Sequence, residues 1–510
     1  MLTPYQTPAW RLVNWKTLTP DERRAHQSRV LSCFIREQVL PFSNHYRRVF
    51  DEHGLSADDI RSVDDLRKIP LTSKHDLLAT KDNPDRSWDF VLLPAELREH
   101  LEVPSHERAE RFHALTDERR AESDRLLWEY FPTHANHTTG RSAPPTAVWF
   151  TRRDLYDHAE KIRRCLAISR NDPLGKMLVL WPFTAVSHQA FWCMPIYGLA
   201  VGAQIIHSGG GKAAGTNTLL ELATRHRPQA LCIMPGYAFH FIRRARESSV
   251  SFENLRSVYI GGEKCTNEMR QKLHEGFVSL GADPEQLHVI VSYGATEFRG
   301  GSQECPTTPG DYSSSWYHTF PDMEIYEIVD PDTGEPVPEG ETGEVVYTCL
   351  DGRGTVLIRY RTGDLAVGGM TTQPCPHCGS TVPRISNELQ RVSNMKDLSL
   401  TKLKGSLVDM GAFTPLLRGI ESVEEFQVEL CKRNDDPFDM DELVVHVALR
   451  SGASKDVVAE NVKSTLQDAT EVKPNRVVFH SLDEMLEMVG MESSLKDIRL
   501  VDRRPQETKV

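Results

Sequence analysis

Five short apolar runs, separated by amphipathic segments, constrain the fold of this chain more than any other feature. The runs are Met177–Trp181, Ala203–His207, Ala230–Met234, Ser257–Gly261 and His288–Tyr293. The amphipathic segments between them include Thr216–His226, Ala238–Ser248 and Asn267–Leu280. Short buried strands that alternate with helices are typical of a largely parallel, doubly wound sheet. We therefore expect an α/β fold whose ligands bind beyond the carboxyl ends of the strands.

The pattern changes on both sides of this stretch, and a chain of 510 residues is too long for one simple core. We expect a large N-terminal domain over residues 1–390 and a small, mobile α+β domain over residues 391–510. The large domain divides into a helical part, an α/β core and a β-rich part, which cover residues 1–130, 131–320 and 321–390.

Local signals support these parts. Thr19 precedes Pro20, Asp21 and Glu22, which places a capping hydroxyl, a helix-starting proline and acidic side chains at the start of a helix. Residues 82–104 are polar and are predicted to be rich in loops. Further strands are predicted at Met323–Asp330, Gly343–Leu350, Thr355–Arg359 and Val444–Leu449.

Charge and hydropathy exclude two classes of partner. The chain carries 60 basic and 72 acidic residues, for a net charge of −12, and has no basic run. Contacts to nucleic acid need clustered Lys and Arg, so we expect no nucleic-acid partner. No apolar run is long enough to span a bilayer, and the N-terminus lacks the pattern of a signal peptide. We therefore expect a cytoplasmic protein with no membrane partner.

The stretch Tyr293–Glu297 (YGATE) follows a predicted strand. Gly294 would let a ligand approach the backbone, Thr296 could donate a hydrogen bond to a phosphate oxygen, and Glu297 could hold Mg²⁺. Taken alone, the stretch also fits an ordinary turn at a strand end.

A second stretch, Tyr360–Asp364 (YRTGD), follows the predicted strand Thr355–Arg359. A carboxylate held on a tight turn can accept hydrogen bonds from two neighbouring hydroxyls, as on the ribose of a nucleotide. Taken alone, a hairpin turn with Asp364 as a turn residue is the better explanation.

Together and in this order, the two stretches resemble the adenylate-forming superfamily of acyl-CoA synthetases, peptide-synthetase adenylation domains and luciferases. Ile260–Glu263 looks like the adenine-side strand end of that family. Three further segments resemble its phenylacetate–CoA ligase branch, namely Pro235–Ala238, the helix at Asn267–Leu280 and the C-terminal Ser493–Asp502. The resemblance covers about residues 130–504.

The resemblance implies an ATP-dependent, AMP-forming ligase. Such an enzyme activates a carboxylic acid as an acyl-adenylate, with release of pyrophosphate, and then transfers the acyl group to CoA. An amine, a hydroxyl or a carrier-protein thiol is the alternative acceptor. A relic that binds nucleotide without turnover is the third hypothesis, and a homodimer is compatible with all three.

The resemblance also assigns roles to residues. Thr296 would contact the α-phosphate and Glu297 would hold Mg²⁺. Asp364 would bind the ribose hydroxyls with help from Arg391, and Lys496 would bridge the attacking carboxylate and the phosphate. A compact cation suits that position, because one anion attacks another there. The other nucleotide-binding residues would be Gly262, Glu263, Tyr293 and Gly294.

The phosphate loop departs from the family pattern. Thr138, Thr139 and Gly140 match its Ser-, Thr- and Gly-rich character, in which hydroxyls and backbone N–H groups hold the departing pyrophosphate. Asn136 and His137 replace the serine and glycine that normally precede them. His137 either donates to phosphate or caps a turn.

The turn from Cys375 to Cys378 (CPHC) can hold a metal ion, because thiolates two residues apart can share one tetrahedral ion. A redox pair and free cysteines are the alternatives. The resemblance to phenylacetate–CoA ligases implies two more ligands, Cys305 and His318, for a structural Zn²⁺. His377 is the alternative fourth ligand.

The acid pocket is expected among residues 188–197, 234–240 and the Gly261 region. Phe191, Tyr237 and Gly261 are the predicted lining residues, and the family branch favours an aryl acid as the substrate. The resemblance also implies that the small domain swings about a hinge near residues 391–395, and that Gly405 lies close to the thiol acceptor.

Overall fold

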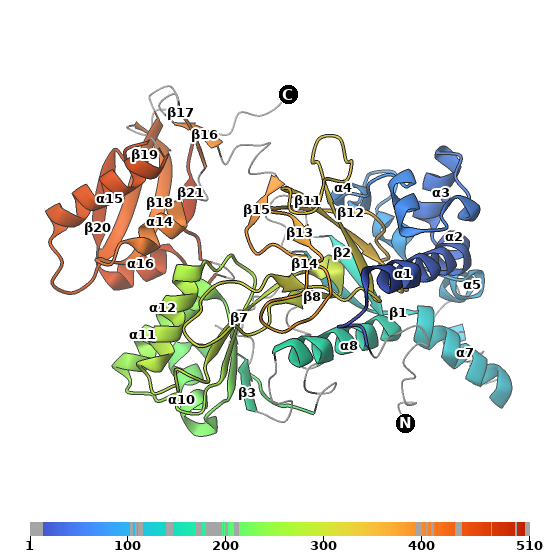
Figure 1. Cartoon of the computed structure of the whole chain (residues 1–510), viewed down its shortest axis with the longest axis horizontal. Helices are drawn as coiled ribbons and strands as arrows, with labels where there is room; N and C mark the ends of the chain where they lie inside the picture. The colour runs from blue at the N-terminus through green and yellow to red at the C-terminus, as the bar shows by residue number, and fades with distance from the viewer. Residues whose placement is uncertain are drawn as a thin grey trace.

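The computed structural model describes residues 14–102, 106–107, 110, 116–138, 146–169, 176–179, 196, 198, 202–208, 214–392, 400–403, 406–409, 413–433, 441–470, 472–494 and 497–504. The helical N-terminal part (blue) and the C-terminal region (orange to red) lie on opposite sides of the α/β and β-rich parts (Figure 1). Among the described residues, no helix is both long and apolar enough to cross a membrane.

A nine-stranded sheet forms the centre of the molecule, in the order β13-β14-β9-β8-β7-β6-β5-β3-β4. Its parallel half confirms the five predicted strands, with ends that differ by one or two residues: β3 (Lys176–Val179), β4 (Gln204–Ile206), β5 (Ala230–Ile233), β6 (Ser257–Ile260) and β7 (His288–Ala295). Its antiparallel half consists of β8 (Gly300–Gln303), β9 (Tyr317–His318), β14 (Arg384–Ile385) and β13 (Met370–Thr371).

Helices cover both faces of the parallel half, as expected for a doubly wound sheet. Leu231, Val258 and Val291 belong to the main core, on the same side as α10 (Thr216–His226), α11 (Pro235–Glu247) and α12 (Asn267–Val278). Their neighbours Cys232 and Tyr259 pack with α8 (Arg152–Ser169) on the opposite face. Helix α11 begins three residues before its predicted start, because Pro235 is preorganised for the first helical turn.

The β-rich part is a four-stranded antiparallel sheet made of β10 (Glu324–Val329), β11 (Gly343–Cys349), β12 (Tyr360–Ala366) and β15 (Leu389–Arg391). The predicted strand Thr355–Arg359 is wrong. These residues are buried, but their backbone forms hydrogen bonds with separate segments near residues 46, 72, 90, 149 and 349. Arg359 then adopts φ +49°, which turns the chain into β12.

Helices α1 (Pro20–Phe34), α3 (Asn44–Glu52) and α7 (Asp117–Tyr130) dominate the N-terminal part. Thr19 and Glu22 form a reciprocal capping box at the start of α1, which confirms the predicted helix start. The loop prediction for residues 82–104 is wrong in part, because α5 (Ala95–Glu102) lies within it. Good helix formers follow Pro94 there, and Leu97 anchors the helix in the core.

The C-terminal region has a sheet and a core of its own. Its strands lie in the order β20-β19-β18-β21, with bounds Arg476–His480, Asp441–Leu449, Val423–Lys432 and Leu500–Asp502. Helices α14 (Phe413–Gly419), α15 (Lys455–Thr470) and α16 (Leu482–Met488) accompany them, and a hairpin of β16 (Leu400–Leu403) and β17 (Ser406–Asp409) precedes them. Residues 393–399 and Gly405 lie outside the described part, so the domain boundary and the hinge stay predictions.

Candidate active site and metal centre

The first motif begins inside β7 and continues into a single 3₁₀ turn, Thr296–Phe298. Glycine is needed here because β7 and β8 approach closely: a Cβ on Gly294 would lie 2.7 Å from the Gly300 carbonyl oxygen. The buried Lys161 of α8 donates to the Phe298 carbonyl at 2.8 Å and pairs with Glu324. The close approach of β8 and the hydrogen bond from Lys161 therefore hold the turn that carries Thr296 in place.

The second motif forms a bulge in β12. The register with β11 shifts here, so that residues 362–364 lie opposite Val345 alone, and Gly363 adopts φ +73°. The bulge presents Asp364 to two partners. The Tyr293 hydroxyl donates to Asp364 Oδ2 at 2.9 Å, and the Arg391 guanidinium lies 3.1 Å from Oδ1.

A second tyrosine connects the two motifs in the opposite direction, from the second motif to the first. Tyr360, from the second motif, donates its hydroxyl to Glu297 Oε1 of the first motif at 3.2 Å. Burial raises the pKa of Glu297, while Tyr360 and the positive charges of Lys74 and Arg391 oppose that rise. Burial also raises the pKa of Tyr360, so its phenol stays protonated and donates to Glu297.

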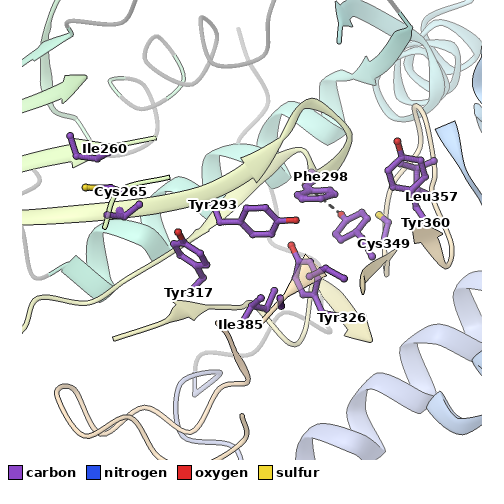
Figure 2. Packing of buried hydrophobic residues seen from close by; sticks show 14 of the residues in the cluster. Ile260, Cys265, Tyr293, Phe298, Tyr317, Tyr326, Cys349, Leu357, Tyr360 and Ile385 are labelled. Carbon is purple, nitrogen blue, oxygen red and sulfur yellow. Dashed lines mark hydrogen bonds between the residues drawn. The ribbon is translucent and has the colours of Figure 1, made fainter. Parts of the chain in front are cut away.

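The two motifs therefore meet, although they belong to different sheets. Each contributes a tyrosine that orients the carboxylate of the other. Tyr293 packs against Phe298 and Tyr317, with ring centroids 5.7 and 5.6 Å apart, where the central sheet meets the β-rich part (Figure 2). Tyr360 and Lys74 were not among the site residues predicted from the sequence. Each motif begins with a tyrosine, and this shared feature was the signal in the sequence that could have predicted the pairing.

The other predicted residues lie around this pair. Gly261 and Gly262 follow β6, which is parallel to β7, so they lie at the same sheet edge as the first motif. Gly262 adopts φ +80°, and Glu263 is one of the acidic residues that oppose the lowering of the Arg418 pKa by burial. Tyr237 is buried in the main core with its hydroxyl 2.7 Å from Thr216 Oγ1. Thr139, Gly140, Phe191 and Lys496 lie outside the described residues.

The predicted phosphate loop joins the two strands of a hairpin, β1 (Pro132–His137) and β2 (Ala147–Thr151). Thr138 closes the hairpin: its N–H donates to the Thr146 carbonyl, and its hydroxyl accepts from the Thr146 N–H, both at 3.1 Å. The side-chain oxygen of the buried Asn136 has no hydrogen-bond partner among the described residues. His137 ends β1 and is partly exposed, which fits either of its predicted roles.

Cys305, His318, Cys375 and Cys378 converge, with ligand atoms that all lie within 4.8 Å of one another. The cluster contains His318 and not the alternative His377. The sulfur atoms of Cys305 and Cys375 are 3.7 Å apart, too far for a disulfide. Zn–S bonds of about 2.3 Å at a tetrahedral angle place two sulfurs about 3.8 Å apart.

The imidazole of His318 is oriented toward the same point. Its Nε2 lies 3.3 Å from Cys378 Sγ, while Nδ1 lies 3.1 Å from the Trp316 carbonyl oxygen. Because that carbonyl can only accept, Nδ1 carries the proton and Nε2 is free to bind a metal. Three sulfurs and one nitrogen in this arrangement fit a closed tetrahedral Zn²⁺ site.

Comparisons with known proteins identify the family. The family model of the AMP-binding enzymes matches residues 136–354. The phenylacetate–coenzyme A ligase of Thermus thermophilus is 32% identical over 397 residues, which cover 74% of this chain and 73% of that protein. The Escherichia coli phenylacetate–coenzyme A ligase is 28% identical over 391 residues, covering 75% and 73% of the two chains.

Solved structures confirm the fold. A 2-hydroxyisobutyryl-CoA ligase in its postadenylation state, bound to an acyl-AMP, matches with a TM-score of 0.73 at 18% identity, covering 98% of this chain and 94% of that one. The same ligase in its thioesterification state, bound to 2-HIB-AMP and CoA, matches with a TM-score of 0.60 at 19% identity and the same coverage. From the sequence relatives and the fold together, this chain belongs to the phenylacetate–coenzyme A ligase branch of the adenylate-forming enzymes and is an AMP-forming acid–CoA ligase.

Proposed function

We propose that this ligase activates an aryl acid and transfers it to CoA, with Glu297, Asp364, Thr296 and Lys496 in the roles that the sequence analysis assigned. The observation that carries these roles is the reciprocal pairing of Tyr293 with Asp364 and Tyr360 with Glu297. It keeps two carboxylates with different tasks in fixed orientations at one site. A purely structural pair of turns would not need two partly buried carboxylates oriented in this way.

The chemistry follows from the charges. Asp364 accepts hydrogen bonds from the ribose hydroxyls, and the Arg391 guanidinium beside it contributes a positive charge. Thr296 donates to the α-phosphate, and Glu297 would hold a magnesium ion, which would supply positive charge beside the phosphates. Lys496 approaches from the C-terminal region and shields the acid as it attacks the phosphorus.

The position of the C-terminal region supports the interpretation that this structure represents the state that forms the acyl-adenylate. The whole-chain match is better to the postadenylation state of the 2-hydroxyisobutyryl-CoA ligase than to its thioesterification state. We infer that transfer to CoA requires a second arrangement, reached by rotation about a hinge near residues 391–395. Such a rotation can limit turnover.

A screen of acids with ATP and Mg²⁺ tests this function. Pyrophosphate release is expected with aryl acids, and the product with CoA is expected to have the mass of the acyl-CoA thioester. A product formed only with an amine, a hydroxyl or a carrier-protein thiol would favour the alternative acceptor. Tight ATP binding without pyrophosphate release for any acid would favour a protein that binds nucleotide without turnover, and it would contradict the proposal.

We propose further that Cys305, His318, Cys375 and Cys378 hold one structural Zn²⁺. The neighbouring loop also binds the N-terminal segment, because Ser380 and Thr381 donate to the Lys16 carbonyl. A metal here would join the segments around Cys305, His318 and Cys375–Cys378. With four protein ligands, it would have no coordination position left for catalysis.

Cys378→Ser is expected to purify without zinc and to melt several degrees below the wild type, because it removes one of four ligands. Elemental analysis and thermal denaturation measure both effects. Cys33→Ser removes an exposed thiol from α1 and is the matched control, with the metal content unchanged. Wild-type protein that is zinc-free after expression with added zinc would contradict the assignment.

A further inference from the structure

The C-terminal region docks on the large domain through the helices on one face of the central sheet. It lies beside α11 and α12 (Figure 1), and Lys272 of α12 donates to the Arg418 carbonyl at 2.8 Å. Arg243 of α11 lies 3.5 Å from Glu424, at the start of β18. These exposed or rim contacts are of the kind that contributes little by itself. Two other contacts in this interface are more specific.

The first specific contact is a hydrogen-bond network that ends on Glu492. Its Oε1 accepts from Thr216 Oγ1 at 2.6 Å and lies 2.7 Å from His240 Nε2. Arg243 contacts the other ring nitrogen of His240 at 2.6 Å, and arginine can only donate. The Nδ1 atom is therefore an acceptor, and Nε2 carries the proton that His240 donates to Glu492.

The direction of the hydrogen bond between Tyr237 and Thr216 follows from the bond between Thr216 and Glu492. The Thr216 hydroxyl gives its proton to Glu492, so the Tyr237 hydroxyl donates to Thr216. His240 is nearly fully buried, with a side chain 3% exposed, whereas the Glu492 side chain is 46% exposed. A carboxylate from the C-terminal region thus receives two donors that are built into α10 and α11.

The second specific contact is a close approach at the start of α11. A Cβ on Gly236 would lie 2.1 Å from Asp497 Oδ2 and 3.2 Å from a guanidinium nitrogen of Arg418. Asp497 cannot easily move aside, because Arg499 donates to the same oxygen at 2.9 Å and both side chains are buried. Only a residue without a side chain allows Asp497 to lie there.

Glu492 and Asp497 are described residues that flank Leu495 and Lys496 in the sequence. Glu492 is bonded by α10 and α11, and Asp497 lies against the first turn of α11, which also carries the predicted pocket residue Tyr237. We propose that Glu492 and Asp497 are positioning residues for adenylation: the Thr216–His240 pair and the gap at Gly236 seat the segment that carries Lys496. This inference rests on the proposed function, because it assumes that Lys496 acts only in adenylation.

Substitutions on the two sides of the interface test the inference. Gly236→Ala is expected to slow acid-dependent pyrophosphate release by about 10–100-fold, since displacement of a catalytic group by an ångström can cost that much. Thioester formation from a preformed acyl-adenylate is expected to stay within about twofold, because that step does not use this docking. Gly236 lies in the first turn of α11 without a positive φ, so alanine suits its backbone.

Glu492→Ala is expected to show the same selective loss, and Glu492→Gln, which keeps an acceptor oxygen, is expected to retain much of the adenylation rate. Glu487→Ala is the matched control, because it removes an equal charge from an exposed position on α16. Circular dichroism and thermal melting confirm that each variant folds.

The outcomes separate the two proposals. Equal loss in both half-reactions, or no loss of adenylation in Gly236→Ala and Glu492→Ala, would overturn the positioning role. A wild-type protein that releases no pyrophosphate with any acid would instead overturn the proposed function.

Discussion

Lys496→Ala is expected to lower acid-dependent pyrophosphate release by about 10²–10³-fold, the usual cost of removing one preorganised group that stabilises transition-state charge. In adenylation, a carboxylate attacks a phosphate that is itself anionic, so a cation that shields both is needed only in this step. The transfer to CoA starts from an adenylate that has already formed. We therefore expect thioester formation from a synthetic acyl-adenylate to stay close to the wild-type rate.

The two half-reactions are measured separately, by pyrophosphate release and by thioester yield from the preformed adenylate. Lys463→Ala on α15 is the matched control: it removes a lysine from the same region whose contact is an ion pair with the exposed Glu460. Its effect should be small, because exposed pairs contribute little. Equal losses of both half-reactions in Lys496→Ala would count against the assigned role.

Asp364→Ala is expected to impair both half-reactions, which distinguishes it from Lys496→Ala. The ribose is present in ATP and in the acyl-adenylate, so its anchor matters in each step. Hydrogen bonds to a charged group contribute about 1.5–3 kcal/mol each, so losing two of them corresponds to about 10²–10⁴-fold in kcat/KM. The substitution also leaves the Tyr293 hydroxyl and the Arg391 guanidinium without this carboxylate.

Steady-state kinetics at varied ATP concentration measure this loss. Asp364→Asn keeps the shape of the side chain and should lose less, while Tyr293→Phe removes only the orienting hydrogen bond and should cost about tenfold, the equivalent of one ordinary bond. An Asp364→Ala protein with an unchanged KM for ATP and unchanged rates would show that the carboxylate is a turn residue and does not contact nucleotide.

The α/β core could be read directly from the sequence. The apolar runs that became β3, β4, β5, β6 and β7 lie within a residue or two of their predicted ends, and α10 matches its predicted range. Their alternation with helices is a local, repeated signal that leaves few other folds. The convergence of Cys305 and His318 on the Cys375–Cys378 turn was predicted as well, because the resemblance to phenylacetate–CoA ligases supplied these two residues.

Predictions that relied on local composition alone were less successful. Thr355–Arg359 has the residues of a strand and the burial of one, but its hydrogen bonds go to several separate segments. Residues 95–102 lie in a stretch that is polar overall, yet they form a helix because Leu97 finds a place in the core. In both cases the tertiary partners decided the backbone state, and these partners are far away in the sequence.

Glu297 and Asp364 were singled out from the sequence alone, because the two motifs occur together and in the order of the adenylate-forming family. Their orientation was decided only by the tertiary structure. A central sheet and a bulged strand had to meet before Tyr293 could reach Asp364 and Tyr360 could reach Glu297. The docking of Glu492 on His240 is likewise invisible in the sequence. Hydrogen bonds depend on distances within a few tenths of an ångström, and a linear pattern contains no such distances.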